Sequence, residues 1–204
     1  MKFTLSILAL LAIAFLVGCS AKDTSNNNKL SNSEITKLGK KYGGVYVFNK
    51  KFEKEIDDRE RERKEAIKEL KGRDLGGGLY AVDTKPVDQK FPQTLSNGKK
   101  YYTSTRSYEQ DYKKAVNVSK KYINEVINFI GQEDYNKFKP SIDIGYFYVD
   151  NDEIVPIELS ATYSYQGTKF GLFGDEGRGF ALSRDEIRYT KGGNRFYLED
   201  LERR

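Results

Sequence analysis

The chain has 204 residues, of which 32% are charged and 13% are aromatic, and its formal net charge is +5. It has no histidine and one cysteine, which excludes Ser-His-Asp and Cys-His catalysis, zinc or haem sites with a histidine ligand, and an intramolecular disulfide. The aromatic content predicts a packed domain, and the even mixture of cations and anions is not typical of a nucleic-acid-binding surface.

The first residues have the pattern of an export signal. Lys2 gives a positive start, an apolar run extends from Leu5 to Val17, and Leu16-Val17-Gly18-Cys19 closes it. The run is shorter than the roughly 20 apolar residues that cross a bilayer, so it predicts a cleaved signal peptide rather than an anchor helix. These four closing residues resemble the lipobox of bacterial lipoproteins, a resemblance that covers residues 1–19 only.

The resemblance implies cleavage before Cys19, a diacylglyceryl thioether on its sulfur, and acylation of its amino group, for which palmitate is typical of the family. Two or three acyl chains would hold the protein permanently, because a single chain binds only reversibly. Ser20, where an aspartate would favour the inner membrane, implies sorting to the outer membrane. In a host with one membrane the same anchor would leave the protein on the outer face of the cell. The alternative is an ordinary secretory leader that has a cysteine near its cleavage site.

The chain therefore divides into a signal peptide over 1–18, a lipidated flexible tether over 19–32, and a single α+β domain over 33–204. The tether is small and polar, and as a flexible coil it would keep the domain within roughly 20 Å of the lipid.

The first half of the domain is expected to be mainly helical. Ser31 and Glu34 have capping-box spacing and predict a helix over 33–41, and a short strand over 45–48 follows. Nearly every residue over 50–71 is charged, which predicts a helix exposed along most of its length and packed at its ends. Three acid-before-base pairs lie four residues apart along it: Glu55–Arg59, Asp57–Arg61 and Glu60–Lys64.

The glycine-rich segment 72–80 lacks the Gly-Lys-Ser/Thr of a phosphate-binding loop and predicts a flexible turn. An irregular connection over 84–98 and a short strand near 99–105 follow. An apolar stripe then predicts one long amphipathic helix over 107–130, capped by Ser107 and ended by Gly131, with a short helix over 133–138 behind it.

After Pro140 the apolar period changes from 3.6 to 2, which predicts an antiparallel meander. The expected strands are 142–148, 155–165, 168–173, 180–182, 187–190 and 195–198. Turns are expected at 150–152, at 166–167, at 174–179 and, as a hairpin, at 191–194. Ser183 and Glu186 have capping-box spacing. Helices followed by strands indicate an α+β fold, with the 107–130 helix lying across one face of the sheet.

Three groups of residues are candidate sites. Asp150-Asn151-Asp152-Glu153 supplies oxygen atoms for calcium but lacks the glycine and distant glutamate of an EF-hand, so turn residues are the simpler interpretation. Asp143 and Glu158 on neighbouring strands are a candidate carboxylate pair for glycoside hydrolysis. Ten tyrosines are candidates for a binding face of the sheet: Tyr42, Tyr46, Tyr80, Tyr101, Tyr102, Tyr146, Tyr148, Tyr163, Tyr165 and Tyr189.

The sequence thus predicts a lipid-anchored envelope protein without enzymatic activity, which binds a macromolecule near the membrane through the tyrosine-bearing sheet or the charged helix over 50–71. The expected partners are the membrane itself, an envelope protein or the cell wall, and a toxin or phage component if the protein confers immunity. We expect no nucleic-acid partner, no cofactor and no metal, and no pattern selects the ligand-binding residues. The alternatives are a carboxylate-dependent hydrolase of glycan or peptidoglycan and a purely structural envelope lipoprotein.

Overall fold

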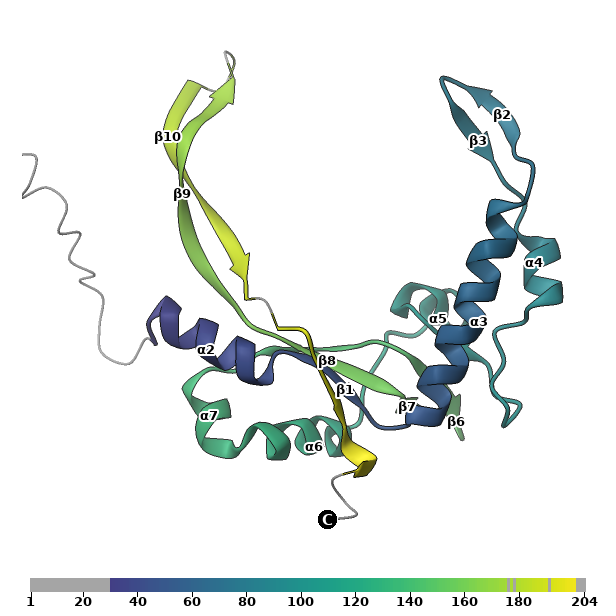
Figure 1. The fold of residues 1–204 in the computed structure, drawn as a ribbon, viewed down its shortest axis with the longest axis horizontal. Helices are drawn as coiled ribbons and strands as arrows, with labels where there is room; N and C mark the ends of the chain where they lie inside the picture. The colour runs from purple at the N-terminus through teal and green to yellow at the C-terminus, as the bar shows by residue number, and fades with distance from the viewer. Residues whose placement is uncertain (1–29, 176, 178, 191, 201–204) are drawn as a thin grey trace, which may run out of the picture.

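Two arms rise from the same side of a central body in the computed structural model (Figure 1), which describes residues 30–175, 177, 179–190 and 192–200. One arm is a long two-stranded ribbon and the other is a helix that carries a small hairpin. The predicted signal peptide, Cys19 and most of the predicted tether lie outside the described residues.

The body is built on a four-stranded sheet in the order β11-β1-β8-β5. Its strands are β1 (Gly44–Val47), β5 (Ser141–Ile144), β8 (Glu158–Thr162) and β11 (Asn194–Tyr197). β1 pairs antiparallel with β8 and parallel with β11, so the sheet is mixed. A short 3-10 helix, η1 (Leu198–Asp200), follows β11.

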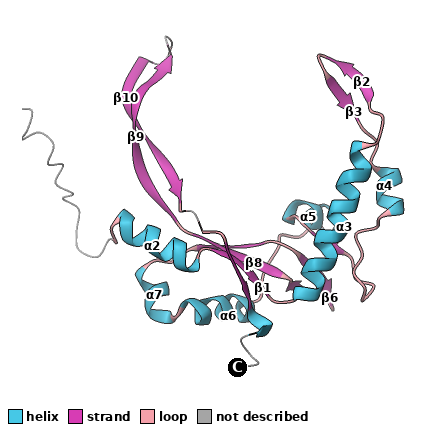
Figure 2. Cartoon of the chain, in the orientation of Figure 1, coloured by secondary structure: helices cyan, strands magenta, loops and turns pink. Residues whose placement is uncertain are grey.

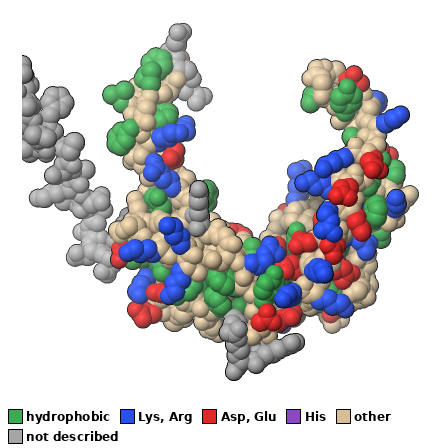
Figure 3. All heavy atoms as spheres, viewed as in Figure 1, with side chains coloured by type: hydrophobic (Ala, Val, Ile, Leu, Met, Phe, Trp, Pro, Cys, Tyr) green, Lys and Arg blue, Asp and Glu red, His purple; other side chains and the backbone are tan. Residues whose placement is uncertain are grey.

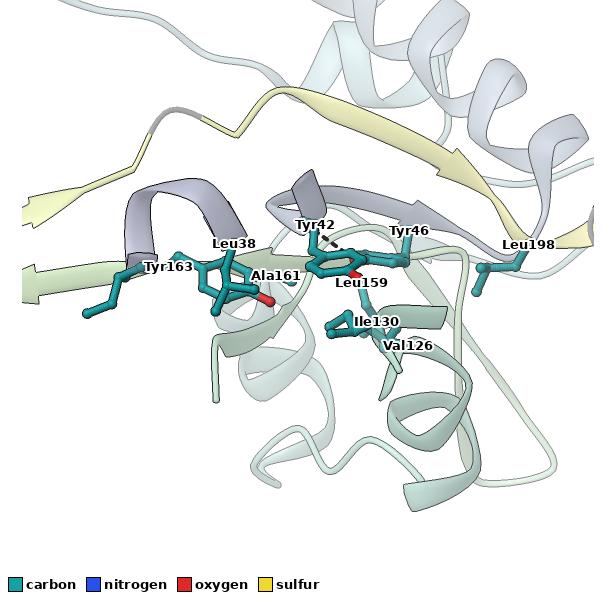
Figure 4. Packing of buried hydrophobic residues seen from close by; sticks show 10 residues of the cluster. Leu38, Tyr42, Tyr46, Val126, Ile130, Leu159, Ala161, Tyr163 and Leu198 are labelled. Atoms are coloured by element: carbon teal, nitrogen blue, oxygen red, sulfur yellow. Dashed lines mark hydrogen bonds between the residues drawn. The ribbon is translucent and has the colours of Figure 1, made fainter. Parts of the chain in front are cut away.

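Three helices pack around this sheet: α2 (Asn32–Tyr42), α6 (Lys120–Ile130) and α7 (Gln132–Lys137). The largest hydrophobic cluster joins Leu38 of α2 and Val126 of α6 to Leu159 of β8. Within it, the Tyr46 hydroxyl donates a 2.7 Å hydrogen bond to the Tyr42 carbonyl oxygen (Figure 4), which satisfies a polar group that is otherwise buried.

A second sheet has the order β4-β6-β7, formed by β4 (Tyr101–Tyr102), β6 (Phe147–Asp150) and β7 (Glu153–Pro156). Helix α5 (Thr105–Tyr112) covers it, and Tyr108 meets Tyr102 with ring centroids 5.6 Å apart. Figure 2 shows how short helices and strands alternate through the body.

The helical arm consists of α3 (Lys50–Lys68), the hairpin β2 (Arg73–Gly76) and β3 (Leu79–Ala81), and α4 (Lys85–Lys90). Ile56 is completely buried at the base of α3. Higher up, Glu60 accepts hydrogen bonds from the Tyr101 hydroxyl and the Gln93 amide, and Arg63 bonds to Asp88 of α4. Polar contacts therefore hold the middle of a helix that has few apolar residues to bury.

The other arm is the antiparallel ribbon of β9 (Ser164–Asp175) and β10 (Gly179–Tyr189). It forms a sheet of its own and joins the body only at its base, where α2 lies against β9.

Several sequence predictions are confirmed. The fold is α+β, and α2 begins with the full capping box of Ser31 and Glu34. Strand β1, helix α3 and helix α7 lie within a few residues of their predicted ranges. The turn at Asn151 and Asp152 has the positive φ angles, 49° and 63°, of a tight hairpin.

The predicted long helix over 107–130 is wrong. The chain forms α5 and α6 instead, α5 is capped by Ser104 rather than Ser107, and Lys113 ends it with a φ of 55°. The apolar stripe is real but serves two different cores. Tyr108 packs on the second sheet, whereas Val126 packs on the main sheet.

The predicted strand order at the C-terminal end is also wrong. Residues 142–148 divide at Gly145 into β5 and β6 of different sheets, and 155–165 divide similarly into β7, β8 and the start of β9. β9 runs through the expected turn at 166–167, and β10 runs through the expected cap at Ser183. The hairpin expected at 191–194 is wrong, because β11 pairs with β1 rather than with β10, and the Asn194 amide donates to the Gly43 carbonyl oxygen.

The ion pairs of α3 also differ from the prediction. In the described residues they run three apart rather than four, as Arg61–Asp58 and Arg63–Glu60 illustrate.

Candidate binding surface

The ribbon exposes more large apolar side chains than any other element in the described part of the chain. Phe170 is 82% exposed and Leu182 is 78% exposed. The full set of exposed large apolar residues on the ribbon is Phe170, Leu172, Phe180, Leu182, Ile187 and Tyr189. Figure 3 shows apolar side chains along this arm and charged ones nearer its base.

Both faces of the ribbon are open. Side chains alternate along β10, so Ile187 and Tyr189 share one face while Phe180 and Leu182 share the other. Phe170 of β9 lies opposite Ser183 of β10. Ser183 and Ile187 are four residues apart on β10, so the Phe170 side chain lies on the same face as Ile187. An apolar face of a β-sheet normally packs on a core. Exposed apolar residues on both faces of the ribbon therefore indicate an interaction surface.

Local contacts hold the two strands together. Arg188 of β10 donates to the Thr168 carbonyl oxygen of β9 at 3.0 Å, and the Thr168 hydroxyl donates to the Asp185 carboxylate at 3.0 Å. A register shift between Ala181 and Ser183 places one extra β9 residue in the ladder. Near the tip, Gly174 has a φ of 114°, and a Cβ there would lie 2.0 Å from the Gly179 carbonyl oxygen, so the strands approach closely only because glycine is present.

The exposed area is large enough for a specific interface. With roughly 150–250 Å² for a fully exposed aromatic side chain and less for Leu and Ile, the six ribbon residues present on the order of 700 Å². A standard protein–protein interface takes about 800 Å² from each partner. A partner that covers both faces of the ribbon would therefore bury about as much surface as one side of such an interface.

A second, smaller apolar surface is the hairpin β2–β3 at the end of the helical arm. Its exposed residues are Leu75, Leu79, Tyr80 and Val82. Its three turn glycines, Gly76 to Gly78, all have positive φ, and nothing lies within 4 Å of where their Cβ atoms would be. The glycines are thus required by the turn itself and not by close packing.

A buried charge cluster lies where α3 meets the main sheet. Arg195 of β11 pairs with Glu53 of α3, and Glu158 of β8 lies nearby with one carboxylate oxygen that has no partner among the described residues. Burial raises the pKa of both Glu53 and Glu158, and Arg195 partly offsets that rise. Gly145 makes room for Glu158, since a Cβ there would lie 2.4 Å from a carboxylate oxygen.

The structure places the predicted carboxylate pair in unlike surroundings. Asp143 is exposed on β5 opposite Ser160, whereas Glu158, two residues along β8, is buried. Glu158 interacts electrostatically with Glu53 and Arg195. Two shallow surface hollows, of about 260 and 310 Å³, are lined by neither Asp143 nor Glu158. The sequence reasoning missed Glu53, whose only signal is its place between Phe52 and Ile56 at the start of α3.

The other two predicted groups are the acidic turn 150–153 and the ten tyrosines, and most of their side chains have structural roles. Asp150 and Glu153 pair across the β6–β7 hairpin, and Asp150 binds Lys99 at 3.0 Å. The described residues contain no group of three or more acidic or thiol side chains arranged to hold a metal ion. Of the ten tyrosines, Tyr42, Tyr46, Tyr101, Tyr102 and Tyr163 are buried, and only Tyr80 and Tyr189, on the two arms, are widely exposed. A tyrosine face on the main sheet is therefore wrong for most of them.

No family model, curated protein or solved structure matches this chain. Within the described ranges, no helix is both long enough and apolar enough to cross a membrane. The predicted lipid-attachment residue, Cys19, belongs to the segment outside the described residues.

Proposed function

We propose that this chain is a lipid-anchored protein of the bacterial envelope, without catalytic activity, that binds another protein close to the membrane through the β9–β10 ribbon. The lipobox-like Leu16-Val17-Gly18-Cys19 supports the anchor, and Ser20 favours the outer membrane. The observation that carries the binding role is the set of large exposed apolar side chains on both faces of the ribbon.

A protein partner fits the ribbon better than a lipid or glycan does. Charged side chains lie among the apolar ones along the described part of β10, as Arg184, Glu186 and Arg188 illustrate. Charged side chains are costly to insert into hydrocarbon, whereas a protein that lies along the ribbon can pair with them or leave them in water. The open edges of β9 and β10 also offer unpaired backbone groups to a strand of the partner.

The anchor is tested by metabolic labelling with a palmitate analogue. The wild-type protein is expected to take up the label and to fractionate with membranes, and Cys19→Ala is expected to do neither. Label on the Cys19→Ala variant, or no label on the wild type, would contradict the anchor.

The binding role is tested by photocrosslinking in cells. A photoreactive amino acid at position 172 on the ribbon is compared with one at position 133 on α7, where the Glu133 side chain is 87% exposed. We expect a discrete adduct with one protein from position 172 only, and its loss on adding Leu182→Ser. The same adducts from both positions, or none from position 172, would overturn the proposal that the ribbon binds a partner.

A further inference from the structure

We propose that the β2–β3 hairpin is a second membrane contact, which places its apolar tip in the interfacial layer of a phospholipid bilayer. The inference rests on the proposed function only in that the lipid on Cys19 would bring the hairpin to a membrane. It concerns a different arm from the ribbon and a different kind of partner.

The tip has the composition of an interfacial insert. The eight residues from Leu75 to Val82 include no charged side chain, and Leu79, which directly follows the three turn glycines, is 67% exposed. Tyr80, also widely exposed, combines an aromatic ring with a polar hydroxyl, as side chains at membrane interfaces commonly do. The turn needs only glycine at its tip, and Leu75, Leu79 and Tyr80 leave more than half of their surface exposed.

Charged residues lie next to the tip but not on it. Lys71 and Arg73 precede it, at the level where phosphate groups would meet an inserted hairpin. Asp74 is the nearest anion, and its carboxylate accepts a 2.7 Å hydrogen bond from the Gly76 backbone N–H, which engages it within the turn. Because Glu69 and Asp83 also lie close in sequence, apolar burial rather than net charge would carry the contact.

The two arms differ in the feature that decides between lipid and protein. Along the ribbon, charged residues such as Arg184 and Arg188 lie among the apolar ones, whereas the hairpin has no charged residue from Leu75 to Val82 and has charged residues at its base. Both arms rise from the same side of the body, and α3 holds the hairpin away from it (Figure 1). The hairpin can therefore meet a surface without moving the body.

The chain has no tryptophan, so one substitution gives a unique fluorescent probe. Tyr80→Trp reports on the hairpin, and Tyr189→Trp, at the base of the ribbon, is the control at an equally exposed site on the other arm. The processed full-length protein is reconstituted into vesicles of phosphatidylethanolamine and phosphatidylglycerol, with and without brominated acyl chains. Flotation of the vesicles measures the anchor separately.

We expect the indole emission of the Tyr80→Trp variant to shift to the blue on reconstitution and to lose roughly half its intensity to bromine, as an insertion depth of about 5–10 Å allows. The emission of the Tyr189→Trp variant should stay unchanged. Leu79→Glu in the Tyr80→Trp background should abolish the quenching, and Leu182→Glu in the same background should not. Circular dichroism checks that both double variants fold.

Each other outcome is decisive. Protein that floats without quenching of the Tyr80→Trp probe overturns the hairpin contact and leaves the anchor standing. If Leu79→Glu prevents flotation of the processed protein, the anchor is overturned and the hairpin contact is supported. A blue shift of the Tyr80→Trp emission that needs no vesicles and is insensitive to bromine overturns the membrane contact and indicates a protein contact instead.

Discussion

Arg195→Met is expected to destabilise the fold through the buried charge cluster, and to do so more at neutral than at acidic pH. The substitution keeps an unbranched side chain of similar length but removes the cation that faces Glu53 and Glu158. Removing one partner of a buried ion pair commonly costs about 3–5 kcal/mol. Because the Arg195 side chain is 44% exposed while that of Glu53 is 5% exposed, solvent screening reduces the expected loss at pH 7 to about 2–3 kcal/mol.

The pH dependence follows from the direction of the pKa shifts. The pKa values of Glu53 and Glu158 are raised above the ordinary value of 4.5, so between that value and the folded-state pKa the native state binds more protons than the unfolded state. Their contribution to stability is then most favourable below pH 4.5 and is lost as the pH rises. Without Arg195 the pKa values rise further, so the penalty of the substitution should shrink to about 1 kcal/mol near pH 4.5.

Urea unfolding at pH 7 and at pH 4.5 measures this, with equal m-values required for the comparison. Arg188→Met is the matched control, because the Arg188 side chain is 43% exposed but its partner Glu186 is 30% exposed. That substitution should change stability by less than about 0.5 kcal/mol at either pH. An equal loss from Arg195→Met at both pH values would refute the electrostatic reasoning and indicate that Arg195 contributes only by packing.

Further substitutions test the packing and the titration of the body. Ile56→Ala removes a completely buried side chain at the base of α3 and should lower the free energy of unfolding by about 2–5 kcal/mol in urea titrations. Gly39→Ala should lower the thermal midpoint, because its Cβ would lie 1.9 Å from the Thr190 hydroxyl oxygen, whereas Gly193→Ala, with nothing nearby, should leave it unchanged. Burial raises the pKa of Tyr163 to about 12, so the folded protein should lose stability as the pH rises from about 10 to 12, and unfolding at stepped alkaline pH should show less of this loss in Tyr163→Phe.

Elements with local signals were predictable from the sequence. The capping box of Ser31 and Glu34 set the start of α2, and the charge run over 50–68 specified a helix whatever surrounded it. The tight turn at Asn151 and Asp152 fixed the β6–β7 hairpin in the same way. In each case the residues that determine the structure are neighbours in the chain.

Features that depend on distant residues were not predictable. A continuous apolar stripe over 107–130 cannot reveal that its two halves pack on different sheets. The burial of Glu53 depends on Arg195, which is 142 positions away. The alternation predicted strands in this region but divided them at a turn over 166–167 and a cap at Ser183. Only the structure shows that, beyond its base, neither face of the ribbon packs on a core.

The parallel pairing of β1 with β11 constrains the order in which this protein acquires its structure. Asn194 and Gly43, which join the two strands, are 151 positions apart, so the main sheet cannot be completed until the residues of β11 have been synthesised. Contacts between such distant residues slow folding, because a large loop must close before they form. If residues 1–18 direct export, this delay keeps the polypeptide unfolded, and so able to cross a membrane, until the edge strand β11 pairs with β1.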